Sequence, residues 1–347
     1  MTELTYTRHN PLIDPIFHVW EWQIPVYLFL GGLVGGLMII AGIRLLVIRP
    51  KSREDLACCT VGPLIGLGAL SLGMLALFLD LSHKMHVWRL YTTFQPTSPM
   101  SWGSWILLLV YPALAANALA HLPEAIPAVT MRYPVLTTMS DYILARPRLI
   151  LGIGLANTAL GASLGVYTGI LLSTLSGRPL WNSAVLGPLF LFSGLSTAAA
   201  LLHGIHVLTM PSAQRPAFVD FLLSAVARIS QARPLDPSAA PILASADNSF
   251  LTVEVSLLGL FLLGHVTSTA VHHRAAGLLL TGPYAAPFWV LVVGLGITIP
   301  LLLQTLELAH RIRHTLAPSL LVMFGGFALR VILVSAGQAS RWFEALN

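Results

Sequence analysis

The side chains in this sequence that could take part in chemistry interrupt long apolar segments. An ionisable group in hydrocarbon costs about 2.5 to 3.5 kcal/mol, so each one needs a partner or a function. If the segments are helices that rise about 1.5 Å per residue, these groups fall into two layers. The outer layer contains Tyr27, Asp80, Tyr167, His265 and Arg330. The inner layer contains His203, His206, Glu254 and Glu307.

The outer layer combines a carboxylate, two phenols, an imidazole and a guanidinium, and this mixture suits a quinone headgroup. The carbonyls of a quinone accept hydrogen bonds, and its reduction requires two protons from groups such as histidine or a carboxylate. Other interpretations are open, because spacing alone does not separate a quinone from another amphipathic ligand. Asp80 and Arg330 could form a structural ion pair, and Tyr27 and Tyr167 could belong to an aromatic belt. The inner layer could be satisfied by water or backbone groups.

The composition indicates the class of protein that carries these side chains. Hydrophobic residues make up 56% of the sequence and charged residues 10%, compared with about 25% charged residues in soluble domains. We therefore predict a polytopic membrane protein without a cleaved signal peptide. The net charge is +5, but the basic residues are scattered among loops, which argues against nucleic-acid binding. The two cysteines, Cys58 and Cys59, are adjacent, so the sequence has no iron–sulfur or zinc spacing and we expect no metal site.

Eight apolar runs are long enough to cross about 30 Å of hydrocarbon. They lie at 24–48, 61–81, 102–122, 149–175, 185–210, 250–271, 288–308 and 316–336. An even number of spans places both termini on one side, and Lys and Arg are about twice as frequent on the opposite side. We therefore predict an all-α integral membrane protein whose eight transmembrane helices form two four-helix bundles, with both termini on the outer, periplasmic side.

The spans divide the sequence into four regions. They are an outer tail (1–23), the first five transmembrane helices with the main quinone-site elements (24–210), an inner loop (211–249), and the last three helices with a short outer tail (250–347). The inner loop is predicted to contain an amphipathic helix at 218–229 and a Pro/Ala/Ser-rich tether at 233–249. The outer connection at 82–101 is predicted to fold as a cap.

Glycines at helical spacing predict which helix faces pack together, because small residues allow close backbone approach in lipid. The first helix carries Gly31, Gly32, Gly35 and Gly36, and the fourth carries Gly161, Gly165 and Gly169. The fourth helix should therefore turn Tyr167 toward the bundle.

Five motifs resemble the membrane subunit family of polysulfide reductase, also called NrfD/PsrC. In sequence order they are Tyr-Leu-Phe-Leu-Gly-Gly at 27–32, Leu-Asp-Leu at 79–81, His86-Val87-Trp88 with the segment from Phe94 to Trp105, Tyr167-Thr168-Gly169 with Arg178-Pro179-Leu180-Trp181-Asn182, and Gly325-Gly326-Phe327 with Arg330 and Gly337-Gln338. These motifs cover nearly all eight helices in the order found in the family.

The resemblance implies a bacterial inner-membrane anchor that binds menaquinone or ubiquinone and has no haem and no iron–sulfur cluster of its own. It implies electron exchange with a ferredoxin-like iron–sulfur subunit on the outer face, which serves a molybdopterin catalytic subunit. Tyr167 matches the quinone-binding tyrosine of the family, and Asp80 matches the acidic end of the second helix. Tyr27 falls where the family has a histidine and Ile24 where it has an asparagine, so Tyr27 itself or Gln23 would have to replace those donors.

We therefore expect a quinone/quinol-binding subunit of a respiratory oxidoreductase. The expected quinone-binding residues are Tyr167, Tyr27, Gln23, Arg178 and Arg330, and the expected proton-exchanging residues are Asp80, His86 and His265. The inner-layer residues His203, Glu254 and Glu307 could pass protons toward the quinone, which would make turnover electrogenic.

Two other classes of function are open. The first is a haem b anchor, which would need two of His121, His203, His206 and His265 on facing helices at one depth. The second is a proton channel or secondary transporter built on the inner-layer residues. The sequence shows no clear interruption of a helix at mid-membrane, which is the feature that transporter sites commonly use.

Overall fold

The computed structural model describes residues 20–48, 61–81, 83–175, 177–209, 239–309, 311 and 315–342. These residues form helices and no β-strand. Eight of the helical segments are long and apolar enough to cross a membrane, which confirms the predicted all-α fold with eight transmembrane helices. Cys58, Cys59 and the amphipathic helix predicted at 218–229 lie outside the described residues.

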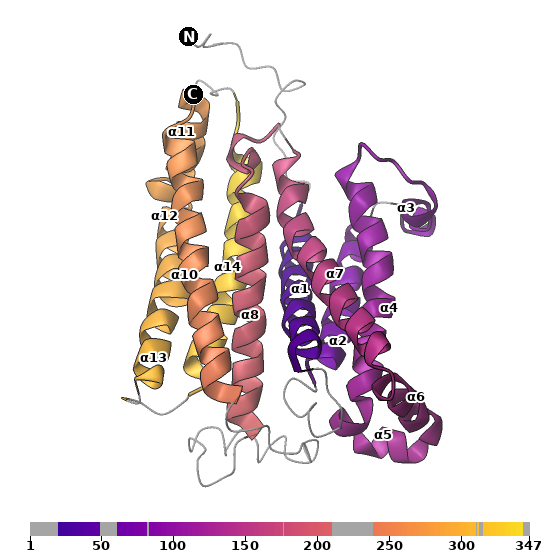
Figure 1. The fold of residues 1–347 in the computed structure, drawn as a ribbon. Helices are drawn as coiled ribbons and strands as arrows, with labels where there is room; N and C mark the ends of the chain where they lie inside the picture. Colours follow the sequence, from indigo (N-terminus) through magenta and orange to yellow (C-terminus); the bar gives the residue numbers. More distant parts are fainter. Residues whose placement is uncertain are drawn as a thin grey trace.

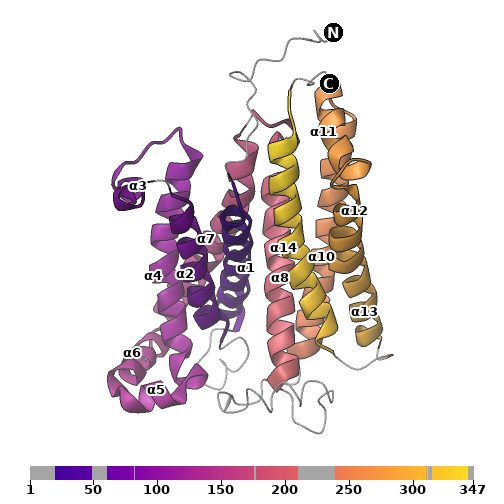
Figure 2. The ribbon, with the colours of Figure 1, turned by 180° about the vertical axis from the view of Figure 1, so that it is seen from behind.

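The transmembrane helices form two groups of four that lie side by side, as Figure 1 and Figure 2 show from opposite directions. The first bundle consists of α1 (Gln23–Ile48), α2 (Gly62–Asp80), α4 (Pro99–Ala125) and α7 (Pro147–Ser173). The second bundle consists of α8 (Leu186–Thr209), α10 (Ala239–Val266), α14 (Ala317–Ala339) and a span built from α12 (Ala285–Pro287), the π-helix η5 (Phe288–Thr298) and α13 (Ile299–Leu308). The bundles meet where α1 and α7 contact α8.

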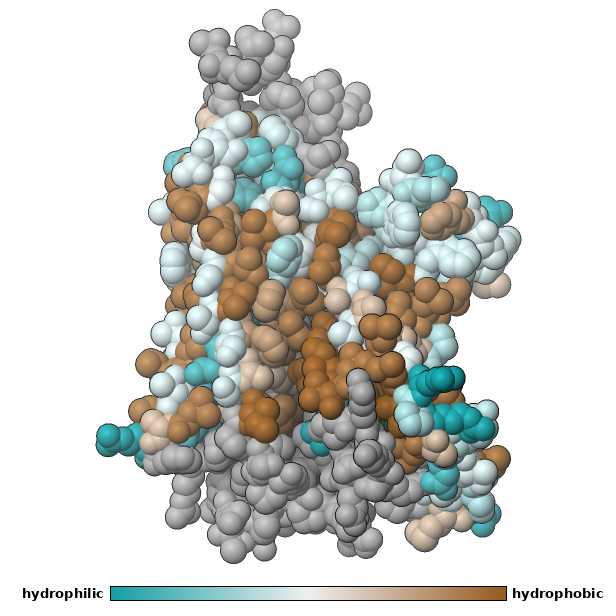
Figure 3. Space-filling model, in the orientation of Figure 1, coloured by the Kyte–Doolittle hydropathy of each residue, from teal (hydrophilic) through white to brown (hydrophobic). Residues whose placement is uncertain are grey.

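Helix α1 begins and α14 ends at the same end of the molecule (Figure 1). We name this the outer end, following the predicted topology, and the opposite end the inner end. Apolar side chains dominate the surface between the two ends (Figure 3). A lipid-facing surface requires this distribution, because hydrocarbon satisfies no polar group.

Short helices fill the connections at both ends of the bundles. At the outer end these are η2 (Lys84–His86), α3 (Arg89–Thr92), η3 (Pro179–Trp181) and α11 (Ala270–Leu280), and at the inner end α5 (Pro127–Arg132) and α6 (Pro134–Leu144). A proline opens α5, α6 and α7, at a position where its missing N–H has no partner to lose. The short helices were not predicted, since they are too short to cross the membrane.

The outer connection folds into the predicted cap. We define the outer cap as Leu81–Ser101, which contains η2 and α3. Its return to α4 is fixed by two bonds: the Gln95 backbone N–H donates to Ser101 Oγ at 3.0 Å, and the Trp102 indole donates to the Pro96 carbonyl at 2.7 Å. A third bond, from Ser104 Oγ to the Leu90 carbonyl at 2.8 Å, holds α3 against α4.

Helix α10 begins at Ala239, well before the predicted start at Phe250. Its first turns were predicted to be a tether because they are rich in alanine and serine and include Asp247 and Asn248. Alanine is the strongest helix former, and tertiary contacts give each polar residue one partner: Asp247 accepts a hydrogen bond from Gln304, and Asn248 donates to Thr305 at 3.3 Å. Because α10 starts earlier than predicted, each of its residues lies farther from the inner end than the sequence suggested.

Backbone-to-backbone contacts along α1 join the two bundles. A Cβ atom on Gly35 would lie 2.8 Å from the Gly161 carbonyl oxygen of α7, and one on Gly36 would overlap the Gly194 carbonyl of α8. The predicted glycine stripes are therefore packing faces. The contact is reciprocal, because a Cβ atom on Gly194 would overlap the Gly32 carbonyl of α1.

We predict that Gly36→Leu destabilises the protein, because α1 and α8 would have to separate. Overpacking of a close contact costs about 1 to 3 kcal/mol, so thermal unfolding of the detergent-solubilised variant, followed by tryptophan fluorescence, should begin at a lower temperature. Gly68→Leu on α2 is the matched control, since a Cβ atom at Gly68 meets nothing within 4 Å. Equal unfolding temperatures for the two variants would contradict the packing argument.

Candidate functional site

Tyr167 lies near the outer end of α7 and is 7% exposed. Its ring packs against Gly103 of α4, where a Cβ atom would overlap the phenol. On the same helix, Gly165 and Gly169 pack against Leu191 and Leu186 of α8. These glycines are two residues from Tyr167 and so point to a different side of α7, which means that α7 is covered by α8 on one side and by α4 on the other. Tyr167 is therefore a buried residue within the first bundle, not a member of an aromatic belt.

Two further phenols accompany Tyr167. Tyr27 of α1 is also buried, and its phenol interacts electrostatically with those of Tyr167 and Tyr91. Tyr91 comes from α3 in the outer cap and was not predicted, although it is the single tyrosine of that connection. Burial, reinforced by Tyr111, raises the pKa of Tyr91, so this phenol stays neutral and able to donate a hydrogen bond. We name Tyr27, Tyr91 and Tyr167 the phenol cluster.

Several polar atoms at the phenol cluster lack partners. Neither the Tyr27 hydroxyl nor the Tyr167 hydroxyl forms a hydrogen bond with any of the described residues. Gln23 lies one turn before Tyr27 on the same face of α1, and its buried Oε1 atom has no partner either among those residues. Buried polar groups are nearly always hydrogen-bonded, so a group of unpartnered atoms indicates a ligand or ordered water.

A cavity of about 540 Å³ lies beside Tyr167, between α4 and α7. Its lining is mainly apolar and includes Trp102, Ile106, Val166 and Ile170. Trp102 and Ile170 are exposed on the surface of the bundle, so the cavity opens sideways. An apolar tail could therefore reach Tyr167 from the lipid.

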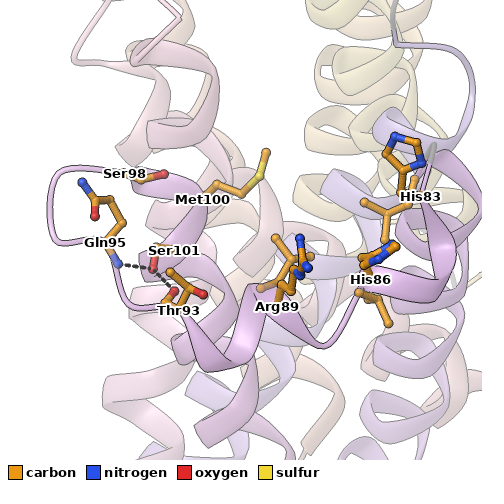
Figure 4. Close-up of a pocket in the computed structure, with 11 residues that line it drawn as sticks. His83, His86, Arg89, Thr93, Gln95, Ser98, Met100 and Ser101 are labelled. Carbon is orange, nitrogen blue, oxygen red and sulfur yellow. Dashed lines mark hydrogen bonds between the residues drawn. The ribbon is translucent and has the colours of Figure 1, made fainter.

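Asp80 and His86 lie at the outer end of the first bundle but have different surroundings. Asp80 is the last residue of α2 and is half-buried, with Glu21 as its electrostatic neighbour. His86 belongs to η2 and lines a second cavity, within the outer cap, together with His83 (Figure 4). The structure therefore brings Tyr27 and Tyr167 together, and it places His86 in a separate cavity.

Arg330 of α14 is completely buried in the second bundle. Its guanidinium donates to Ser193 Oγ, to the Gly326 carbonyl at 2.8 Å and to the Phe190 carbonyl at 3.2 Å. Its electrostatic partner is Glu254 of α10. This excludes the alternative of an ion pair between Arg330 and Asp80.

The predicted division into layers is wrong for Arg330 and Glu254, which interact. Glu254 lies near the middle of α10, because this helix begins at Ala239. Helical side chains point toward the N-terminus of their helix, which for α14 is the inner end. The bond from Arg330 to the Gly326 carbonyl, one turn earlier, shows this direction.

Further polar contacts continue from Glu254 toward the inner end of the second bundle. Glu254 Oε2 accepts a hydrogen bond from Ser196 Oγ at 3.0 Å. Asp247, seven residues nearer the inner end on α10, accepts a hydrogen bond from Gln304 of α13. Asp247 and Glu254 also interact electrostatically. At the inner end, Glu307 lies 3.9 Å from His203 Nε2. We refer to the following residues together as the polar file: Arg330, Glu254, Asp247, Gln304, Glu307 and His203.

Sequence analysis missed Asp247 and Gln304. Asp247 fell in the predicted tether, and Gln304 carries no charge. The available signal was helical spacing, since Asp247 and Glu254 are seven residues apart and Gln304 and Glu307 are three apart, so each pair shares one face of its helix. All four side chains are buried.

Arg178 and His265 join segments at the outer end of the second bundle. The Arg178 guanidinium donates to the Ser340 carbonyl at 2.8 Å, and the Trp181 indole donates to the Leu333 carbonyl at 2.9 Å. His265 Nδ1 lies 2.8 Å from the Phe261 carbonyl, and its Nε2 lies 3.3 Å from the Pro179 carbonyl. These contacts tie the 178–181 segment to α14 and α10.

The histidines are spread over the molecule. His265 lies at the outer end of α10, His203 and His206 share the inner part of α8, and His121 lies on α4 of the other bundle. Both nitrogens of His265 face backbone carbonyls, and His121 Nδ1 lies 2.9 Å from the Asn117 carbonyl. This arrangement does not favour haem ligation, which needs two histidines on facing helices at one depth.

Comparisons with known proteins agree with the motifs. The family described as Polysulphide reductase, NrfD matches residues 8–340. The C subunit of polysulfide reductase from Wolinella succinogenes is 29% identical over 329 residues, which cover 92% of this protein and 94% of that one. The protein NrfD of Escherichia coli is 28% identical over 323 residues, covering 92% and 95%. A NrfD homolog of Haemophilus influenzae is 26% identical, covering 92% and 94%.

We predict that Arg178→Ala destabilises the outer end of the second bundle. A hydrogen bond from a charged group contributes about 1.5 to 3 kcal/mol, so the unfolding temperature should fall. If Arg178 acts only through this contact, the affinity of the folded variant for a quinone-analogue inhibitor should equal that of the unmodified protein. Lost affinity at unchanged stability would instead assign Arg178 to ligand binding.

Proposed function

Because the protein belongs to the polysulphide reductase NrfD family, we propose that it is the quinone-reactive membrane subunit of a respiratory oxidoreductase complex. It is a multi-pass protein of the bacterial inner membrane.

The observation that carries the proposal is the pair of hydroxyls, on Tyr27 and Tyr167, that have no partner among the described residues, with Tyr167 also lining an apolar cavity. A quinone headgroup has two oxygens that accept hydrogen bonds and a tail that favours hydrocarbon. Tyr167 and Tyr27 would donate to the oxygens, and Gln23 Oε1 would accept from a reduced headgroup. The cavity between α4 and α7 would admit the tail.

Bound quinone supplies two-electron, two-proton chemistry, and the residues of this protein hold and protonate it. Asp80 is the half-buried carboxylate at the outer end of α2, and we assign to it the proton exchange between the site and the outer surface. His86 is a second candidate from the outer cap. We assign His265 a positioning role, since both of its nitrogens face backbone carbonyls.

Electrons would be exchanged with a partner at the outer end. The phenol cluster includes Tyr91 of the outer cap, so a ligand there lies beneath a surface that a partner can cover. The sequence contains no spacing for an iron–sulfur cluster, and we propose that a ferredoxin-like iron–sulfur subunit docks at this end and serves a molybdopterin catalytic subunit. The relative from Wolinella succinogenes is named as one lettered component of polysulfide reductase, which is consistent with a multi-subunit reductase.

The polar file supports a second part of the proposal, which is proton transfer from the inner end. His203 and Glu307 lie at the inner end, Asp247 and Gln304 lie deeper, and Glu254 and Arg330 lie at the middle of the bundle. Arg330 Nη2 would lie 3.1 Å from a Cβ atom on Gly32 of α1. Gly32 follows Tyr27 by five residues, or about 7.5 Å along the helix, so the file ends near the helix that carries the quinone site.

We predict that Tyr167→Phe, in the assembled complex, weakens binding of a quinone-analogue inhibitor by roughly three- to tenfold and slows quinol-linked electron transfer. The variant removes one hydrogen-bond donor, which contributes about 0.5 to 1.5 kcal/mol. Tyr142→Phe is the matched control, because Tyr142 is exposed on α6 at the inner end. Unchanged inhibitor binding and electron transfer in Tyr167→Phe would refute the proposed site.

We predict that Glu254→Gln and Asp247→Asn uncouple proton uptake from quinone turnover. In reconstituted vesicles, electron transfer should continue while the membrane potential that it generates falls, since each amide can form hydrogen bonds but cannot carry a proton as a carboxyl group does. Asp141→Asn, at an exposed position on α6, controls for the loss of one carboxylate. If unmodified protein generates no potential, or if Glu254→Gln generates as much as Asp141→Asn, the file does not conduct protons.

A further inference from the structure

The outer cap contains an open cavity of about 500 Å³ that is separate from the cavity beside Tyr167. Its walls are η2, α3 and the start of α4. Hydrogen bonds from the Gln95 backbone N–H to Ser101 Oγ, and from Ser101 Oγ to the Thr93 carbonyl, connect the end of this segment to α4 (Figure 4). None of its lining residues belongs to the cavity beside Tyr167. The proposed quinone site therefore does not account for it.

The lining combines nitrogen-containing and apolar side chains, and Arg89 carries a positive charge. His83, His86 and Arg89 contribute nitrogen donors, and no acidic residue is among the described residues that line the cavity. Leu81, Val87, Leu90 and Met100 provide the apolar surface. In Figure 4 the two histidines and Arg89 lie on one side of the cavity, with Met100 facing them from α4. A ligand that fits this lining has an anionic group next to an apolar one.

The depth of the cap also points to a ligand from the membrane. Trp88, Phe94 and Trp102 are about half exposed around the cavity, and amphipathic aromatic side chains concentrate where hydrocarbon meets headgroups. The Arg89 guanidinium carbon lies 5.6 Å from the centre of the Trp88 ring. The cationic wall is therefore held at the depth where lipid phosphates lie.

We propose that this cavity binds the headgroup of an anionic phospholipid. The phosphate would contact Arg89, His83 and His86, and the glycerol and first methylenes would contact Leu90 and Met100. A guanidinium group binds phosphate through charge-assisted hydrogen bonds, and imidazole N–H groups can donate further hydrogen bonds to it. Occupancy would fix α3 against α4 and so fix the position of Tyr91, although lipid binding itself does not depend on quinone binding.

The first test measures lipid affinity in the delipidated complex by native mass spectrometry. We expect phosphatidylglycerol to bind at least tenfold more tightly than phosphatidylcholine, and the double variant His83→Asn/Arg89→Gln to lose this preference. Lys84→Gln is the matched control, since Lys84 is a cation of the same cap that does not line the cavity, and it should retain the preference. Equal binding of the two lipids, or an equal loss in Lys84→Gln, would overturn the proposal.

Two further measurements identify the source of the phosphate and the place of binding. Inorganic phosphate should not displace the lipid, and displacement at millimolar concentration would show a site for free phosphate instead. A photoactivatable phosphatidylglycerol should label peptides within Leu81–Ser101 in the unmodified complex, a result that needs no variant to fold. Labelling confined to other segments would place the lipid elsewhere and overturn the proposal.

Discussion

Close backbone contact along α1 is the constraint on which the rest of the structure depends. Helices in lipid gain little from hydrophobic burial, so they associate where small residues allow their backbones to approach. Helix α1 packs Gly35 against Gly161 of α7 on one side and Gly36 against Gly194 of α8 on the other. The same helix therefore belongs to the first bundle and forms the contact with the second. Its position sets the depth of Tyr27 relative to Tyr167.

This arrangement separates two kinds of chemistry. The phenols and the lateral apolar cavity belong to the first bundle and its cap. The buried carboxylates and Arg330 belong to the second bundle, where serine, amide and backbone groups surround them. A neutral hydrogen-bonding site suits an uncharged headgroup, whereas charged groups in hydrocarbon need a connected set of partners. The two bundles supply these environments independently, and α1 lies between them.

The sequence predicted the spans well because length and hydropathy determine which segments cross a membrane. It also predicted that Tyr167 turns into the protein, although the glycines on α7 face α8 and the phenol packs against Gly103 of α4. It failed where tertiary contacts decide the outcome. In the first turns of α10, Asp247 and Asn248 form hydrogen bonds with Gln304 and Thr305 of α13, and these contacts cannot be read from the α10 sequence. The interaction of Arg330 with Glu254 was missed for two reasons. The predicted start of α10 was too late, which placed Glu254 too near the inner end, and the Arg330 side chain points toward the inner end.

Stability alone does not explain Arg330. Burying a charged group costs free energy, because desolvation offsets much of its attraction to an opposite charge. Here the guanidinium also requires space next to α1, since a Cβ atom on Gly32 would lie 3.1 Å from Nη2. Because Gly32 has no side chain, α1 can approach α8 closely and the Arg330 guanidinium has room beside α1. Because Tyr27 lies on the same helix, a shift of α1 that repositions the phenol must also change the surroundings of Arg330. Through this shared helix, the proposed quinone site and the proposed proton path can influence each other without a direct contact.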